Sequence, residues 1–292
     1  MIAITGGNGQ LGRATALELL KRIESQQLVV SVREPEKAAE LAGQGVTVRQ
    51  GDFNDPDSLV RAFAGAEQVL IISGDTPNEV RIRQHRTAVD AAKQAGAQHI
   101  VYTSVVDPDP ASPFTFAAIH ADTEAYIQQS GLDYTFFRNG WYLEGLPMMI
   151  GNPVESKAIH FPGGDAKLVF VGRNDIAQGL AIVLTTEGHR NQVYEINTGK
   201  TYSFTEIANA VGKQLGESIQ YVEIPTAALE AGMRSSHLPD FLVEALTGMS
   251  EAVKQHRFEK PSDTLATILG RQPKSLEQFL ADSFTLNSLS AS

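Results

Sequence analysis

Residues 2–12 read IAITGGNGQLG, a short apolar run that leads directly into a glycine-rich segment. The apolar run predicts a buried β-strand, and the residues after the glycines predict a helix. Glycines between a strand and a helix allow a tight turn and let backbone N–H groups approach a pyrophosphate at the positive helix N-terminus. This context predicts a dinucleotide-binding loop, and the alternative is a purely structural glycine turn. The predicted phosphate-binding residues are Gly6, Asn8, Gly9, Gln10, Leu11 and Gly12.

Short apolar runs continue to alternate with helix-compatible stretches through the first half of the chain. This alternation is typical of a parallel sheet with helices on both faces, and it predicts an α/β, doubly wound fold. In that fold a ligand lies across the carboxyl ends of the strands. Asp55-Pro56-Asp57 suits a helix start with Asp55 as the N-cap. The predicted strands are Ile2–Thr5, Leu28–Val32, Val46–Arg49, Gln68–Ser73, Ala97–Ser104 and Asp133–Arg138, and the predicted helices are Leu11–Lys21, Ala38–Ala42, Asp57–Ala64, Arg81–Ala95 and Ala117–Ser130.

From about Asn139 the alternation loosens. Residues 145–164 carry Gly and Pro at irregular spacing, which predicts a loop that lines a pocket. A strand-like run over 192–196, a capping box that begins at Ser203 and a mainly helical region over 225–269 indicate that ordered elements resume.

The composition excludes several kinds of site. The 292 residues include no cysteine, so disulfides, thiolate metal sites and cysteine nucleophiles are excluded. The seven histidines form no H-E-x-x-H motif and no pair four residues apart, so we expect no metal site. There is also no G-x-S-x-G elbow and no phosphate loop of the kinase or ATPase type. The net charge of −10 argues against a nucleic-acid partner.

No window approaches the roughly 18 apolar residues that a membrane span requires, and no signal-type segment precedes the first strand. We therefore expect a cytoplasmic protein without a membrane-spanning segment, either a monomer or a homodimer.

The end of the second predicted strand bears on the choice of dinucleotide. Proteins that bind NAD place an acidic residue there for the ribose 2′-hydroxyl, whereas this chain has Arg33. A guanidinium fits a 2′-phosphate, so NADPH is favoured, and the alternative is a solvated surface arginine. After the third strand, Asp52 and Phe53 are expected at the adenine, although Asp52 can equally cap the loop.

Several segments together resemble the NmrA-like branch of the atypical short-chain dehydrogenases, and within it the bacterial NADPH:quinone oxidoreductases of the short-chain type and the triphenylmethane-dye reductases. The resemblance implies a Rossmann-type fold, NADPH as the cofactor and reduction of a quinone-like planar acceptor. The segments that carry it are residues 2–12, Arg33, Gly51-Asp52-Phe53, Tyr102-Thr103-Ser104, YTFFRNGWY at 134–142 and Leu238-Pro239-Asp240.

The expected catalytic helix departs from that pattern. Short-chain dehydrogenases usually place a Tyr and a Lys four residues apart, and here Phe116 and His120 stand at those positions, while Ser104 matches the usual serine. Without the phenolic acid, simple ketone reduction is disfavoured. Reduction of a quinone is favoured, because solvent or a modest acid can protonate the hydroquinone anion that hydride transfer forms. His120 is expected to hold the nicotinamide ribose or supply a proton near neutral pH, unless it is only a hydrogen-bonded helix histidine. The predicted catalytic residues are His120, Ser104 and Tyr142.

Aromatic residues follow the sixth predicted strand. Trp141 and Tyr142 are expected to stack on a planar acceptor or the nicotinamide, although Trp141 can instead anchor the second lobe. Residues 172–177 resemble a recurrent segment of the family, and this resemblance implies that Asp175 caps a helix. Arg173 is a candidate for the cleft, with a surface role equally open. Arg81, Arg83 and Arg86 are expected on a solvated helix face. The remaining predicted cofactor-binding residues are Ser73, Gly74, Asn139, Trp141 and Arg173.

These features predict an NADP-binding Rossmann domain over residues 1–140 and a smaller, mixed substrate lobe over 141–292 that packs on the first domain and partly completes it. The predicted function is hydride transfer from NADPH to a quinone-like acceptor. The alternatives are an NADP(H)-binding redox sensor without turnover and a reductase of dyes or other xenobiotics.

Overall fold

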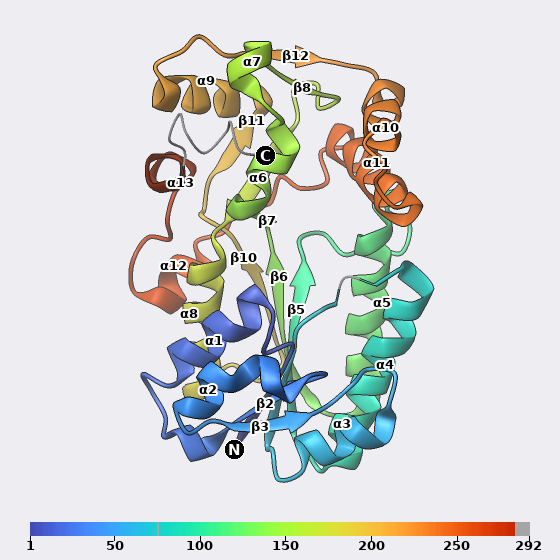
Figure 1. Cartoon of the computed structure of the whole chain (residues 1–292), viewed down its shortest axis with the longest axis vertical. Helices are drawn as coiled ribbons and strands as arrows, with labels where there is room; N and C mark the ends of the chain where they lie inside the picture. Colours follow the sequence, from blue (N-terminus) through green and yellow to red (C-terminus); the bar gives the residue numbers. More distant parts are fainter. Residues whose placement is uncertain (75, 284–292) are drawn as a thin grey trace.

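The chain folds around a seven-stranded parallel sheet with the order β3-β2-β1-β4-β5-β6-β10 (Figure 1). This computed structural model describes residues 1–74 and 76–283. The order reverses between β1 and β4, so the carboxyl ends of these two strands flank the crevice where doubly wound sheets bind ligands. The strands are β1 (Ile2–Thr5), β2 (Leu28–Val32), β3 (Thr47–Gln50), β4 (Gln68–Ile71), β5 (His99–Val105), β6 (Asp133–Asn139) and β10 (Gln192–Ile196).

Side chains along the strands alternate between two apolar layers, so helices cover both faces of the sheet (Figure 1). Ile2 and Ile4 belong to one layer and Ala3 to the other. The first layer contains α1 (Gln10–Leu19), α2 (Ala39–Gly43), α8 (Arg173–Thr185) and α12 (Thr264–Leu269). The second contains α3 (Pro56–Phe63), α4 (Asn78–Gln94) and α5 (Thr115–Ser130).

The strands and helices predicted for the first half are confirmed, with small differences at their ends. Asp55 is the N-cap of α3, as predicted, because its carboxylate accepts a hydrogen bond of 3.1 Å from the backbone N–H of Ser58.

Most of the second half forms a smaller lobe with two short sheets, one of β7, β9 and β11 and one of β8 and β12. Figure 1 shows this lobe above the main sheet. Its strands are β7 (Trp141–Tyr142), β8 (Ala158–Phe161), β9 (Lys167–Val171), β11 (Thr201–Ser203) and β12 (Gln220–Glu223). Its helices are α6 (Leu146–Ile150), α7 (Pro153–Ser156), α9 (Phe204–Leu215), α10 (Thr226–Ser235), α11 (Asp240–Lys254) and α13 (Leu276–Ser283).

The prediction of a loop over residues 145–164 is wrong in part, because α6, α7 and β8 lie within this range. β8 pairs in parallel with β12, which is distant in the sequence, and Leu146 and Ile150 of α6 are buried in the core of the lobe. Such tertiary partners order a segment whose local composition favours a loop.

Two other features of the second half agree with the sequence analysis. The predicted strand over 192–196 is β10, and the capping box is confirmed because Glu206 N–H donates to Ser203 Oγ while Ser203 N–H donates to Glu206 Oε2. β10 extends the main sheet beside β6, and α8 packs against α1. The division after residue 140 stays a prediction, and residues 284–292 of the predicted lobe lie outside the described residues.

Within residues 1–74 and 76–283, no helix has both the length and the apolar character that a bilayer span requires.

Candidate functional site

The glycine loop turns the chain sharply at the end of β1. Gly6 has a φ of +67°, which favours glycine, and its carbonyl accepts a hydrogen bond of 2.9 Å from Gly9 N–H. A Cβ added to Gly12 would lie 2.3 Å from the Gly6 oxygen, so α1 packs directly against the turn. Among the described residues, no side chain caps the N-terminus of α1. The loop therefore places uncapped backbone N–H groups and the positive end of a helix at the crevice.

Arg33, directly after β2, lies on the wall of the same crevice. Its guanidinium makes no hydrogen bond or ion pair with another described residue, so its donors are available to a ligand. Lys37 also lines the crevice, and it forms an exposed ion pair of 2.7 Å with Glu34. The Asn8 side chain donates to the Glu34 carbonyl and so holds the glycine loop beside this segment. Lys37 was not predicted, although its position four residues after Arg33 is a usable signal.

Asp52 and Phe53 lie after β3 and line the crevice. Asp52 Oδ1 accepts a hydrogen bond of 2.8 Å from Asn54 N–H, so its carboxylate caps the turn, which is one of the two predicted possibilities. Gln84 on α4 also lines the crevice and donates to Asn54 Oδ1 at 3.1 Å. Gln84 was not predicted, because α4 reaches this place only through tertiary packing.

Ser73 and Gly74 follow β4 at the point where the strand order reverses. Ser73 N–H donates to Thr103 Oγ1 at 3.1 Å, which fixes the start of this segment against β5. A Cβ at Gly74 would meet nothing within 4 Å, so close packing does not require glycine there.

The Ser104 side chain, at the end of β5, forms a hydrogen bond with a buried carboxylate. Its hydroxyl donates to Glu124 Oε1 at 2.6 Å, and the Arg138 guanidinium binds both oxygens of Glu124. Because a serine hydroxyl has one hydrogen, Ser104 can only accept a hydrogen bond from a ligand. This arrangement does not fit a serine that donates to a substrate oxygen.

His120, on the buried side of α5, lines the crevice and contacts Tyr102 through its Nδ1, at 2.6 Å from the hydroxyl. Burial, with smaller contributions from His85 and Arg81, lowers the pKa of His120 well below its usual value. The imidazole is therefore neutral at pH 7, and the expectation that it supplies a proton near neutral pH does not fit this environment. The ring can still donate or accept a hydrogen bond.

Phe116 lies one turn before His120 and also lines the crevice. Arg81 stacks over its ring, with the guanidinium carbon 4.1 Å from the ring centroid. Arg81 is 3% exposed, so the prediction of a solvated arginine face is wrong for this residue. The other two arginines of this cluster fit the prediction better, since Arg83 is exposed and Arg86 forms a partly exposed ion pair with Asp122.

Asn139, Trp141 and Tyr142 follow β6 and connect the sheet to the lobe. Asn139 Nδ2 donates to the Tyr142 oxygen at 3.2 Å, and burial raises the pKa of Tyr142 to about 12, so its hydroxyl keeps its hydrogen. Trp141 packs between Phe114 and Phe258, with ring centroids 5.4 Å and 5.3 Å away. Trp141 therefore anchors the lobe and also lines the crevice.

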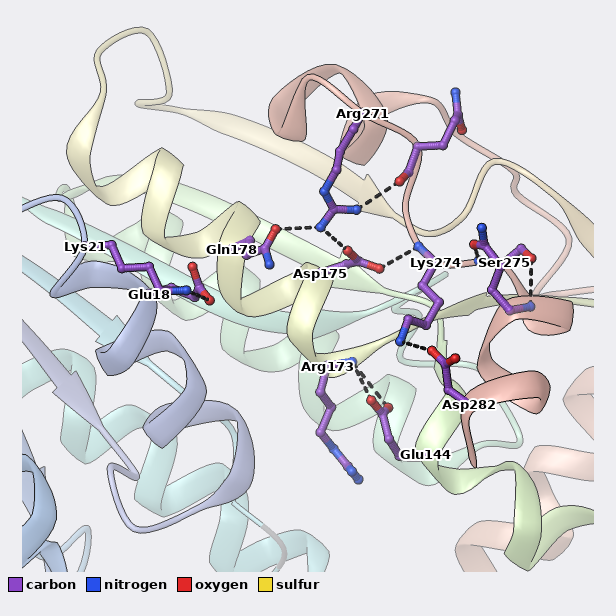
Figure 2. A network of polar contacts seen from close by, with 12 residues as sticks. Glu18, Lys21, Glu144, Arg173, Asp175, Gln178, Arg271, Lys274, Ser275 and Asp282 are labelled. Carbon is purple, nitrogen blue, oxygen red and sulfur yellow. Dashed lines mark hydrogen bonds and ion pairs between the residues drawn. The ribbon is translucent and has the colours of Figure 1, made fainter. Parts of the chain in front are cut away.

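Arg173, the first residue of α8, reaches the glycine loop. Its Nη1 donates to Gln10 Oε1 at 2.6 Å, and its guanidinium carbon lies 5.3 Å from the centroid of the Tyr142 ring. Its backbone N–H donates to the Glu144 carboxylate at 2.9 Å (Figure 2), so a side chain already satisfies this end of α8.

Asp175 does not cap α8, because the N-cap is Gly172 and Asp175 lies within the first turn. Figure 2 shows its buried carboxylate between Arg271 and Lys274. Arg271 Nη2 donates to it at 2.6 Å, and the backbone N–H of Lys274 donates at 2.7 Å. The role of Asp175 is therefore to fasten the segment before α13 onto α8.

A single cavity of about 1400 Å³ joins these features. Every residue that the sequence analysis assigned to the site lies on its wall, while the role of each stays a prediction. Those residues are Gly6, Asn8, Gly9, Gln10, Leu11, Gly12, Arg33, Asp52, Phe53, Ser73, Gly74, Ser104, His120, Asn139, Trp141, Tyr142 and Arg173.

The end of the cavity that faces the lobe has a different character from the glycine-loop end. Four of the five methionines of the chain lie there. The described residues of this wall, which come from α6, β8, α10, α11 and the segments beside them, include no charged side chain. Methionine is flexible and polarisable, so this end can adapt to apolar molecules of different outline. The wall consists of Gly145, Met148, Met149, Phe161, Ile224, Ala228, Leu229, Gly232, Met233, Ser236, Leu238, Leu246 and Met249.

In the described part of the chain, His, Asp and Glu side chains form no group of three or more that could hold a metal ion.

Residues 1–282 match the NmrA-like family. The chain belongs to that family. Quinone oxidoreductase 2 of Escherichia coli is 35% identical to the chain over 98% of its length and all of the relative's length.

Solved structures of NmrA-like relatives agree with this assignment. The NADPH-dependent quinone oxidoreductase of Escherichia coli in complex with NADPH has a TM-score of 0.90, with 35% identity and coverage of 98% of this chain and 100% of that one. The triphenylmethane reductase of a Citrobacter species in complex with NADP(H) has a TM-score of 0.88, with 33% identity and coverage of 97% and 100%.

Proposed function

We propose that this NmrA-like protein is an NADPH-dependent reductase that transfers hydride to an uncharged, planar, quinone-like acceptor. One observation carries the proposal: a single cavity runs from the uncapped glycine loop and Arg33 to an apolar wall without charged side chains. The first end suits a phosphate-rich dinucleotide, and the second suits a flat apolar molecule. The relatives named above, a quinone reductase and a dye reductase that bind NADPH or NADP(H), support the same reading.

The residues at the glycine-loop end fit NADPH. The backbone N–H groups at the start of α1 would hold the pyrophosphate, and Arg33 with Lys37 would hold the ribose 2′-phosphate. Phe53 would flank the adenine. When bound, NADPH supplies the hydride, and the protein supplies binding and orientation.

Aromatic and methionine side chains would hold the acceptor in the lobe end of the cavity. Phe116 and Tyr142 would border the acceptor and the nicotinamide, while the methionine-rich wall would keep water away from the reacting atoms. Ser104 can accept a hydrogen bond and the Tyr142 hydroxyl can donate one, so both groups can orient a bound molecule. Neither is required as an acid, because a hydroquinone anion can take its proton from solvent.

Steady-state oxidation of NADPH, followed by absorbance across a panel of benzoquinones, naphthoquinones and triphenylmethane dyes, tests the proposal. We expect turnover with at least one uncharged quinone, and faster turnover with NADPH than with NADH. Tight NADPH binding without turnover on the whole panel would contradict the enzyme assignment and favour a redox sensor. Turnover on dyes alone would instead assign the same cavity to dye reduction.

A further inference from the structure

We infer that a buried hydrogen-bond network fixes His120 as the tautomer with its hydrogen on Nε2, so that His120 presents one neutral N–H donor to an oxygen atom of the molecule bound in the cavity. The identity of that oxygen rests on the proposed function, whereas the tautomer does not.

The network joins three elements of the fold through side chains that are all buried. The Tyr102 hydroxyl on β5 lies 2.6 Å from His120 Nδ1 and 3.3 Å from His85 Nδ1 on α4. His85 Nδ1 lies 2.8 Å from Thr123 Oγ1, and Thr123 Oγ1 lies 2.9 Å from the carbonyl oxygen of Ile119. These contacts therefore form a continuous series of hydrogen bonds from the Ile119 carbonyl on α5 to the ring of His120.

The number of hydrogens available to this series of contacts constrains the tautomer of His120. The Ile119 carbonyl can only accept, so the single hydroxyl hydrogen of Thr123 lies in that contact. The hydrogen between Thr123 and His85 must then come from His85 Nδ1. A protonated Nδ1 cannot accept, so the Tyr102 hydrogen goes to Nδ1 of His120. The neutral His120 ring therefore carries its hydrogen on Nε2.

Among the four contacts above, any other placement leaves a contact without a hydrogen or leaves the Tyr102 hydroxyl without an acceptor. Thr123 and Ser73 also lie beside the Tyr102 hydroxyl as hydrogen-bond partners. The contact of 2.6 Å with His120 nevertheless fits an O–H donor, because N–H donors usually lie about 2.7 Å or more from their acceptors. Tyr102 is completely buried, so an unpaired O–H there would lose its hydration without compensation. The short distance between Tyr102 and His120 thus assigns the hydrogen of this contact to Tyr102.

No group in the network is charged at neutral pH. Burial, and secondarily Arg81, lowers the pKa of His85 to about 3, and burial raises the pKa of Tyr102 above its usual value. The titratable and charged groups that face the network are Arg81 and His85 from α4, Tyr102 from β5 and Glu124 from α5, apart from His120 itself. Their arrangement keeps both histidines neutral, and a neutral network keeps a fixed tautomer across the neutral pH range.

The donor of His120 faces the cavity. The ring lines the cavity wall, and Nε2 has no hydrogen-bond partner among the described residues. His85 Nε2 also lacks a partner but is buried, whereas His120 Nε2 is not among the buried unpaired atoms. The available N–H therefore points to a ligand and not to the protein interior.

Two oxygens of the proposed complex can accept this hydrogen bond, a hydroxyl of the nicotinamide ribose and a carbonyl of the quinone. In the second case the reaction moves a hydride from NADPH to the acceptor, which oxidises the cofactor and reduces the quinone by two electrons. The first hydrogen of the hydroquinone is the hydride, the second comes from solvent as a proton, and His120 keeps its own hydrogen. A fixed neutral donor stabilises the negative charge that develops on the quinone oxygen without becoming an acid.

Nuclear magnetic resonance of protein labelled with ¹⁵N-histidine tests the tautomer without any substrate. The chain has seven histidines, and His120→Gln assigns the signal of interest. We expect a protonated Nε2 and a bare Nδ1 between pH 6 and pH 8. A signal for protonated Nδ1, or for imidazolium at pH 7, would overturn the inference. Tyr102→Phe removes the hydrogen donated to Nδ1 and should change the His120 pattern, whereas Tyr126→Phe, whose hydroxyl binds Asp90 outside the network, should not.

Binding and kinetics test the donor and identify its acceptor. His120→Ala should weaken NADPH binding about tenfold or more if the oxygen belongs to ribose, or lower kcat by a similar factor with unchanged NADPH affinity if it belongs to the quinone. His120→Gln, which keeps an N–H donor, should recover part of the loss. Unchanged affinity and rates in His120→Ala would refute the donor role. If the wild-type protein reduces no acceptor, the proposed function fails. The nuclear magnetic resonance spectra and the NADPH affinities of the variants still test the tautomer and the donor role of His120.

Discussion

Arg173 and Gln10 are joined by a hydrogen bond of 2.6 Å across the mouth of the glycine loop, although 163 positions separate them in the sequence. Gln10 begins α1 and Arg173 begins α8, so the bond connects the N-terminal ends of two helices that pack together. It also brings a guanidinium to the place where backbone N–H groups already favour an anion. The second half of the chain thus contributes to the predicted phosphate site.

Replacing Arg173 with alanine should weaken NADPH binding about tenfold, because a charge-assisted contact to the pyrophosphate would be lost. Calorimetric titration of the purified variant measures the dissociation constant. Arg83→Ala is the matched control, since Arg83 is exposed on α4 and does not line the cavity. Equal affinities in wild type and Arg173→Ala would remove Arg173 from the cofactor site.

Arg33→Ala should weaken NADPH binding by about tenfold to a hundredfold and leave NADH binding nearly unchanged, because only NADPH carries a 2′-phosphate. Lys37→Ala should have a smaller effect in the same direction, since Lys37 is already paired with Glu34. Titrating both variants with both dinucleotides provides the comparison. An equal loss for NADPH and NADH in Arg33→Ala would show that the phosphate assignment is incorrect.

Gly12→Ala should abolish measurable dinucleotide binding while the rest of the protein remains folded. The new Cβ would lie 2.3 Å from the Gly6 oxygen, so α1 or the turn must move away from the place where the phosphates are expected. Gly43→Ala is a suitable control, because a Cβ there meets nothing within 4 Å. Circular dichroism verifies folding and titration measures binding, and retention of NADPH affinity in Gly12→Ala would contradict this account of the loop.

Acid should destabilise the protein through its buried histidines. Burial is the largest cause that lowers the pKa of His85 to about 3 and that of His99 to about 4. In the unfolded chain both titrate near pH 6.5, so below that pH the unfolded state binds protons that the native state does not. The free energy of unfolding should therefore fall as the pH drops from about 6.5 toward 4, by up to about 1.4 kcal/mol per pH unit for His85.

Urea unfolding at a series of pH values measures this slope. In His85→Asn, the unfolding free energy should depend less steeply on pH over the same range. The decrease should correspond to about one bound proton, because asparagine does not titrate. A slope that is identical in wild type and His85→Asn would show that His85 is protonated in the native state.

The positions of the predicted site residues could be inferred from the sequence because most of them follow strands. Gly6, Arg33 and Ser73 come after β1, β2 and β4, and parallel pairing brings all these ends to one edge of the sheet. For such residues, recognising the strand is enough to place the side chain near the ligand. Their chemical roles need binding and kinetic measurements.

Other features depend on tertiary contacts that no local pattern reveals. The neutral state of His120 follows from burial beside Tyr102 and His85, which come from two other elements. The Ser104 hydroxyl is a donor to Glu124 only because β5 and α5 pack together. Arg81 looked like a surface residue, yet the fold stacks it on Phe116. In each case the residue was identifiable and its chemistry was set by a distant neighbour.

The placement of β10 beside β6 has a consequence for biosynthesis. While the chain emerges from the ribosome, the six strands of the first half can pair, but the open edge of β6 and the apolar side of α1 remain uncovered until residues 173–196 have been made. During this interval of synthesis, the unpaired backbone N–H and C=O groups at the edge of β6 are accessible to other chains. A fragment that stops at residue 140 would stay in that condition permanently, so aggregation of this fragment and solubility of one that extends through β10 is the expected contrast.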